Sequence, residues 1–159
     1  MEQSIQLNEH NKQEYPPMHT AEHLLNQTMV RLFGCKRSSN AHIERKKSKI
    51  SFTLPTCPTE EQVQQIVTKM NELIQQDLCV NYEFCNRNEL PDEIEKDRLP
   101  IDASDVVRLV RIGNYDVCPC IGTHVEHTGQ IGKFILLGTN WDEEKHNFRI
   151  RFKLETNSN

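Results

Sequence analysis

The segment His19-Thr20-Ala21-Glu22-His23-Leu24-Leu25 carries two histidines four residues apart within a stretch of helical apolar spacing. At about 100° per residue, their imidazoles lie only ~40° apart around a helix, beside its apolar face. They therefore project together toward the rim of whatever the helix packs against. Two histidines one turn apart make half of a good zinc site, although the spacing alone is weak because histidine pairs also occur as ordinary core residues.

A second pair of metal-binding residue types follows about a hundred residues later. It lies in the string Asp116-Val117-Cys118-Pro119-Cys120-Ile121-Gly122-Thr123-His124-Val125, which is followed by Thr128-Gly129-Gln130-Ile131-Gly132. Together the two strings offer three imidazoles and one thiolate, a complete ligand set for zinc. The expected metal ligands are His19, His23, Cys120 and His124.

The sequence leaves the roles of three residues near the expected ligands open. The residue that follows His19 argues against one class of zinc enzyme. Cys118 is a second thiol near the expected ligand, and the sequence does not decide whether it also binds metal. Glu22 and Glu126 are candidate carboxylates for orienting the imidazoles, or ordinary surface residues. Thr20 stands where a zinc protease of the His-Glu-x-x-His type has its glutamate base, so a protease is not expected.

Length and composition indicate one ordinary globular domain. The chain has 159 residues, of which 36% are hydrophobic and 26% charged, enough for a single core. It contains no run of eighteen apolar residues, and its first residues lack the apolar core of a signal peptide, so we expect a cytoplasmic protein with reduced cysteines. Four cysteines without metal-like partners are interpreted as packing or incidental residues: Cys35, Cys57, Cys79 and Cys85.

The apolar pattern predicts an α+β domain. Residues 1–17 form a polar lead-in, and a helix over residues 18–33 ends at Gly34, a plausible C-cap. A second amphipathic helix opens at a capping box that begins with Thr59. Strands are expected at residues 41–44, 49–54, 79–85, 106–112, 132–139 and 147–154. Because this order has no regular βαβ alternation, we expect a mostly antiparallel sheet packed with two main helices in one domain, residues 18–155.

Charge is unevenly distributed along the chain. The net charge is −4, but residues 31–49, here called the basic segment, contain seven basic residues and only one acid, Glu44. Residues 89–105 are instead strongly acidic. The basic segment is either a solvated turn or a patch that contacts phosphates, and the sequence alone does not choose between them.

The two ligand strings resemble the two zinc motifs of the alanyl-tRNA synthetase editing domain, which freestanding alanyl-tRNA editing proteins share. The family pattern is H-T-A-x-H-L-L in a helix, then C-G-G-T-H-V followed by T-G-x-I-G. Thr123 favours the alanyl type, because the more distant threonyl-tRNA synthetase editing domain tends to have proline there. The resemblance covers about residues 18–154, nearly the whole chain.

The resemblance implies an α+β editing fold with zinc held by the four expected ligands. It also implies hydrolysis of the aminoacyl ester at the 3′ end of a mischarged tRNA, without ATP. Family members of the alanyl type remove serine, and often glycine, from tRNA(Ala) in trans. Zinc could polarise a water or only position the substrate, and four bound protein ligands would favour the second role.

Further site residues are expected from the loop composition and the resemblance. Thr20 and Thr123 are expected to line the aminoacyl pocket with hydroxyls, and Gly122 to keep backbone N–H groups accessible to an oxyanion. The glycine could instead only permit a tight metal-binding turn. The expected contacts to acceptor-stem phosphates are Arg37, Arg45, Lys46, Lys47 and Lys49. The expected partner is the acceptor end of tRNA, with no membrane and no DNA, and the oligomeric state stays open.

Departures from the family pattern leave alternatives to the editing hydrolase. Ile121 replaces the first family glycine, which could narrow the pocket, and Ser38-Ser39-Asn40 stands where relatives often have glycines. The chain could therefore be a catalytically silent, zinc-containing tRNA-binding module. It could also edit another mischarged tRNA, such as Ser-tRNA(Thr), or use zinc only to join the first helix to the later loop of an interaction domain.

Overall fold

The computed structural model describes residues 15–92, 94 and 105–155. Within these ranges the chain forms two α-helices, seven strands and two short 3-10 helices, η1 (Arg87–Glu89) and η3 (Thr128–Ile131). All strand pairs are antiparallel, so the predicted α+β class is confirmed. Most of the expected lead-in lies outside the described residues, and the first helix begins within it, at Pro16.

The predicted end of the first helix and the predicted start of the second are confirmed. Helix α2 (Pro16–Phe33) has proline in its first turn, where no intrahelical N–H is needed. It ends at Gly34, whose φ of 69° places it in the left-handed region and whose N–H donates to the Val30 carbonyl. Helix α3 (Glu60–Gln75) opens with the predicted capping box between Thr59 and Gln62.

The capping box gives a stability prediction. Thr59→Ala removes the hydroxyl that accepts the Gln62 N–H at 3.1 Å, so we expect the free energy of unfolding to fall by about 1 kcal/mol. Urea denaturation measures the change. The matched control is Thr68→Ala, an exposed threonine inside the same helix, where alanine's higher helix propensity predicts no loss. Equal losses in both variants would contradict a specific capping effect.

The first sheet has four strands in the order β1-β2-β7-β6. Its members are β1 (Asn40–His42), β2 (Ser48–Thr53), β6 (Lys133–Asp142) and β7 (Asn147–Glu155). The basic turn of the sequence joins β1 to β2, and a register shift between Leu136 and Gly138 bends β6. The predicted strands at these positions are confirmed to within a few residues.

The second sheet has three strands in the order β3-β4-β5, namely β3 (Val80–Asn86), β4 (Val106–Ile112) and β5 (Asp116–Pro119). The sequence analysis predicted no strand between residues 112 and 132, and the structure corrects this by pairing β5 with β4. The strand is too short for a period of its own, and a tight turn at Gly113, with φ of 50°, joins it to β4.

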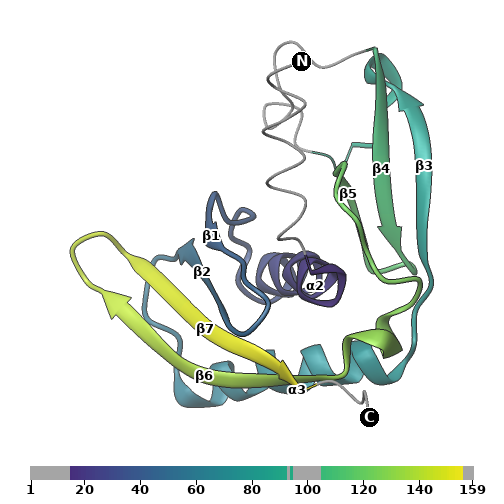
Figure 1. Cartoon of the computed structure of the whole chain (residues 1–159). Coiled ribbons are helices and arrows are strands. Elements are labelled where there is room, and N and C mark those ends of the chain that lie inside the picture. The colour runs from purple at the N-terminus through teal and green to yellow at the C-terminus, as the bar shows by residue number, and fades with distance from the viewer. Residues whose placement is uncertain (1–14, 93, 95–104, 156–159) are drawn as a thin grey trace, which may run out of the picture.

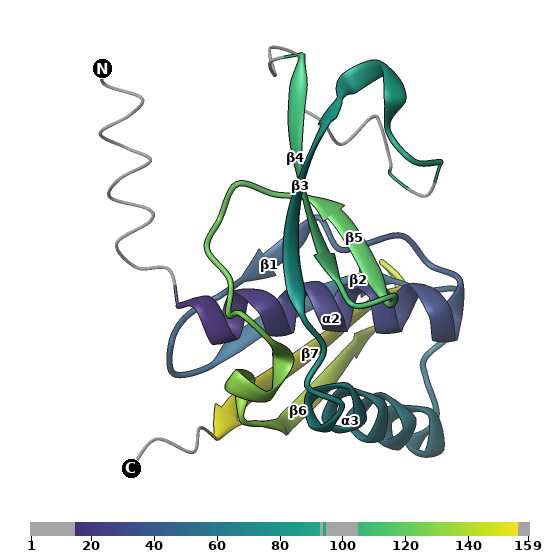
Figure 2. The same ribbon diagram turned by 90° about the vertical axis from the view of Figure 1, so that its right-hand side faces the viewer.

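Helix α2 lies in the angle between the two sheets, with α3 packed below it (Figures 1 and 2). One core joins residues of both helices and both sheets, including Leu25, Phe52, Met70, Ile112 and Phe152. Because α2 is enclosed on most sides, even its polar Thr20, Asn26 and Thr28 are buried and require internal partners. None of the described helices is long and apolar enough to span a membrane.

Candidate metal centre and cleft

The four expected ligands lie together, although two come from α2 and two from the loop after β5. One ligand atom from each of His19, His23, Cys120 and His124 lies within 4.8 Å of the others. The His19 and His124 rings stack with centroids 4.2 Å apart, and the His23 and His124 centroids are 4.5 Å apart. Cys120 Sγ lies 3.4 Å from His19 Nε2. One small ion could contact all four.

The burial of these histidines keeps them in the form that binds metal. Desolvation, with a further contribution from the charge of His124, lowers the pKa of His23 well below its ordinary value. Burial, followed by the charge of His19, lowers the pKa of His124 to about 3. Both imidazoles are therefore neutral near pH 7, as a zinc ligand must be.

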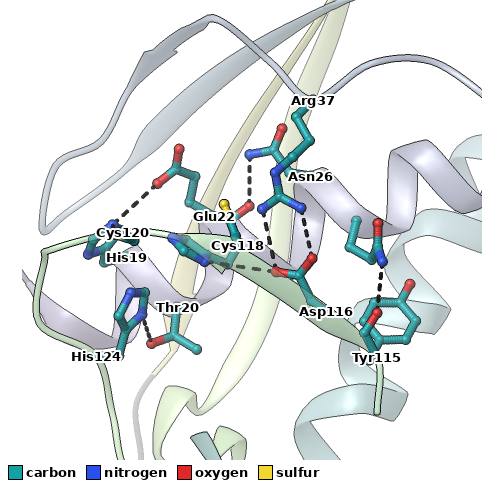
Figure 3. A network of polar contacts seen from close by, with 12 residues as sticks. His19, Thr20, Glu22, Asn26, Arg37, Tyr115, Asp116, Cys118, Cys120 and His124 are labelled. Carbon is teal, nitrogen blue, oxygen red and sulfur yellow. Dashed lines mark hydrogen bonds and ion pairs between the residues drawn. The ribbon is translucent and has the colours of Figure 1, made fainter. Parts of the chain in front are cut away.

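Hydrogen bonds orient two of the rings toward the cluster. His19 Nδ1 lies 3.1 Å from the Thr123 carbonyl, which accepts a hydrogen bond from it. The other ring nitrogen, Nε2, therefore faces Cys120. His124 Nδ1 lies 2.9 Å from the Thr20 hydroxyl (Figure 3). The other nitrogen, His124 Nε2, is buried without a hydrogen-bond partner among the described residues. A bound cation would satisfy that nitrogen, so the residues fit zinc.

Thr20 has a different place from the one expected. Its side chain is fully buried, and its hydroxyl also accepts the Val125 N–H at 3.2 Å. The residue is therefore a positioning residue behind His124 and does not line a substrate pocket. Gly122 is likewise engaged, because its N–H points to Cys120 Sγ at 3.4 Å. Thr123 is exposed, and it holds His19 through its carbonyl.

The position of Thr20 gives a prediction for metal affinity. Thr20→Val keeps the shape of the side chain but leaves His124 Nδ1 and the Val125 N–H without their partner. We expect zinc affinity to fall about 10- to 100-fold, as for other outer ligands of metal-binding histidines. Competition with a chromophoric chelator measures the affinity. Thr20→Ser retains the hydroxyl and should stay near wild type, and a similar loss in both variants would contradict the assignment.

A cleft of about 480 Å³ opens beside the cluster, between α2 and β5. It shares three of its lining residues with the ligand set: His19, His23 and Cys120. Other polar and charged side chains also line it, including Asn26, Arg37, Ser38 and Asp116. The cleft can therefore receive a small polar group next to the candidate metal.

A buried ion pair forms the wall of the cleft (Figure 3). The guanidinium of Arg37 donates to both oxygens of Asp116, at 2.8 and 3.4 Å, and the Asp116 carboxylate is 1% exposed. Burial is the largest single influence and lowers the pKa of Arg37, but the charge of Asp116 and several smaller contributions, including the hydrogen bond to Asp116, together outweigh it, so the pKa is raised overall. Arg37 was expected to contact phosphates. Its guanidinium is 14% exposed and binds Asp116, and a contact with phosphate stays a prediction.

Asp116 is a site residue that the sequence analysis did not identify. Its Oδ2 lies 3.9 Å from His23 Nδ1, a nitrogen that is buried without a hydrogen bond among the described residues. The carboxylate thus lies beside the Nδ1 atom of this expected ligand. Its signal in the sequence was its spacing, because residues 116, 118 and 120 alternate onto one face of an extended chain.

Arg108 is the second residue that was missed. From β4 its Nε donates to the Cys120 carbonyl at 2.7 Å and its Nη2 donates to the Gly122 carbonyl. The guanidinium also stacks over the Tyr82 ring, 4.4 Å from the centroid. The residue fixes the ligand-bearing loop against the second sheet. An arginine in a β-branched strand that also contains Arg111 gave no signal of this role.

The structure also shows where four other residues from the sequence analysis lie. Cys118 is outside the four-ligand cluster, and burial raises its pKa to about 11, which keeps it a thiol. Ile121 is 79% exposed, so it does not narrow the cleft as expected. Glu22 Oε1 lies 3.9 Å from His19 Nε2, whereas Glu126 is an exposed residue. All six cysteines are free thiols.

The remaining basic side chains expected at the tRNA surface are all exposed. They lie in the turn between β1 and β2 or at the start of β2: Arg45, Lys46, Lys47 and Lys49. The Arg45 guanidinium lies over the ring of Tyr15, 4.3 Å from its centroid. Whether the turn contacts RNA stays a prediction.

Comparison with known proteins gives consistent matches. Residues 107–151 match the family described as threonyl and alanyl tRNA synthetase second additional domain. The alanine–tRNA ligase of Halorubrum lacusprofundi is 33% identical over 124 residues, 76% of this chain and 13% of the relative. That of Caldicellulosiruptor saccharolyticus is 31% identical over 123 residues, 75% of this chain and 14% of the relative. The chain thus spans about one seventh of the length of these two ligases.

Proposed function

We propose that this chain, which is similar to the threonyl and alanyl tRNA synthetase second additional domain and to part of alanine–tRNA ligases, is a zinc-dependent hydrolase that deacylates mischarged tRNA(Ala) in trans. Ser-tRNA(Ala) is the first expected substrate and Gly-tRNA(Ala) the second. The observation that carries the proposal is the cluster of three histidines and one cysteine at the mouth of a small polar cleft.

The proposed roles follow from the contacts of each side chain. His19, His23, Cys120 and His124 would hold the ion, which when bound supplies Lewis acidity or an anchor for the ester. Thr20 and the Thr123 carbonyl keep two imidazoles turned toward it. Arg108 keeps the loop in place through two backbone carbonyls. The cleft beyond His23 would accept the aminoacyl group, with Asn26 and Ser38 among its polar lining residues.

A second hydrolytic site suits the chemistry of alanine selection. A synthesis pocket made for alanine cannot strongly exclude glycine, and serine differs from alanine by only one hydroxyl. A polar cleft can instead bind the serine hydroxyl, which alanine lacks. The proposal therefore predicts that Ala-tRNA(Ala) is spared.

The exposed basic turn is proposed to contact acceptor-stem phosphates. Changing Arg45, Lys46 and Lys47 together to glutamate should weaken tRNA binding and reduce the slope of log affinity against log salt by roughly 0.7–0.9 for each phosphate that the variant no longer neutralises. Fluorescence anisotropy over a salt series measures both. A control with Lys133, Lys145 and Lys153, which are also exposed, changed to glutamate has the same net charge. Equal effects in the two triple variants would place the RNA elsewhere.

The test of the function is release of amino acid from defined substrates. The zinc-loaded protein is incubated with Ser-tRNA(Ala), Gly-tRNA(Ala), Ala-tRNA(Ala) and Ser-tRNA(Thr). Rapid loss of serine from tRNA(Ala), with alanine retained, supports the proposal. Retarded tRNA mobility without release would favour the silent binding module, and release from Ser-tRNA(Thr) alone would reassign the substrate.

A further inference from the structure

A group of exposed hydrophobic side chains lies next to the candidate metal centre. Most large hydrophobic residues of the described chain are buried, but Tyr82 is 43%, Phe84 72% and Val106 51% exposed. All three lie on the paired strands β3 and β4. Exposed aromatic residues so close together commonly mark a binding surface.

The strand register places these residues on one face of the second sheet. Residues paired across antiparallel strands have side chains on the same face. Tyr82 pairs with Val110, Phe84 with Arg108 and Asn86 with Val106. Because Val110 belongs to the core around α2, this face is the side toward α2. Strands β3 and β4 extend past the helix (Figure 1).

The opposite face of the same sheet is already covered. Val107, Leu109 and Val117 are buried there against Leu90 and Ile94. On the face toward α2, by contrast, Tyr82, Phe84 and Val106 remain substantially exposed to solvent. We call Tyr82, Phe84, Val106 and Arg108 the aromatic face.

The aromatic face is continuous with the metal centre and carries positive charge. The Tyr82 ring lies 6.5 Å from the ring of His124, an expected ligand. Arg108 stacks on Tyr82 and holds the Cys120 carbonyl. The acid on β3, Glu83, pairs with Arg111 on the other face. The aromatic face thus combines ring surfaces with a cation and has no carboxylate of its own.

We propose that the aromatic face binds the unpaired nucleobases at the 3′ end of the RNA, with Phe84 as the main stacking surface. The inference rests on the proposed function, because an ester at the metal centre belongs to the terminal ribose. The base of that nucleotide must then lie near the cluster, and the base before it follows next along the strand. Exposed rings bind single-stranded bases by stacking, and an adjacent arginine attracts the phosphates between them.

The experiment measures binding of uncharged RNA, so it does not depend on hydrolysis. The probes are a tRNA acceptor minihelix ending in single-stranded CCA and the same duplex without the overhang. For the CCA minihelix, Phe84→Ala should weaken affinity about 5- to 100-fold. Phe84→Trp should retain it. For the blunt duplex, the two variants and the wild type should bind alike.

The control variant is Leu137→Ala, an exposed residue of similar size on β6 of the other sheet, which should leave both affinities unchanged. Zinc content is measured in every variant to exclude indirect loss of the metal centre. Wild-type protein that does not distinguish the overhang from the blunt duplex would overturn the proposal, as would equal loss on both RNAs. Unchanged RNA affinity with altered self-association of Phe84→Ala in light scattering would assign the face to a second copy of the chain.

The binding experiment and the deacylation assay can fail independently of each other. A protein that deacylates tRNA but binds the minihelix independently of Phe84 retains the function and loses this inference. A protein that binds the overhang through Phe84 but releases no amino acid retains the inference and is a binding module.

Discussion

Replacing His23 with alanine is expected to reduce bound zinc from about one ion per chain to a small fraction, and to abolish release of serine. The side chain is buried and lies 3.9 Å from Asp116, so its removal leaves three of the four ligand side chains. Loss of an outer-shell partner costs about 10- to 100-fold in metal affinity or activity, and loss of a ligand should cost more. Elemental analysis and the deacylation assay measure the two effects.

The matched control is His42→Ala. His42 is also a histidine, but its side chain is 63% exposed on β1 and contacts only Glu44 in the described contacts. This variant should keep wild-type zinc and activity. A folded His23→Ala protein with full zinc content would contradict the ligand assignment, and one without zinc but with full activity would contradict a catalytic role for the metal.

Asp116→Ala is expected to destabilise the fold by about 3–5 kcal/mol, because it leaves the guanidinium of Arg37 in a buried place without its charged partner. Both side chains are largely enclosed, at 14% exposure for Arg37 and 1% for Asp116. The change also removes the carboxylate behind His23, so zinc affinity should fall as well. Denaturation in the presence of a chelator measures the first effect without the second.

Two companion variants separate a buried pair from a general effect of charge removal. Replacing both members together, with Arg37→Met and Asp116→Leu, removes both charges and should recover much of the lost stability. Glu83→Ala breaks the more exposed pair with Arg111 and should cost less than about 1 kcal/mol. If Asp116→Ala cost no more than Glu83→Ala, the ion pair would not be a major support of the fold.

Local patterns in the sequence determined the helices, most strands and the identity of the candidate ligands. Apolar spacing of about 3.6 residues, the glycine after α2 and the capping box at Thr59 act over a few residues, so they are visible without the fold. The two ligand strings were equally visible because zinc restricts its ligands to few residue types at short spacings. Their resemblance to the two zinc motifs of one family supported assigning both strings to a single metal site.

The tertiary structure alone decided what surrounds those ligands. Strand β5 exists because β4 pairs with it, and this pairing carries Asp116 to a position between Arg37 and His23. Thr20 became a support for His124, and Ile121 lies in solvent outside the cleft. The contacts of Asp116 with Arg37 and of Thr20 with His124 join residues about eighty to a hundred positions apart. A sequence determines which groups are available, but burial and partners depend on which distant elements pack together, and that is a property of the whole fold.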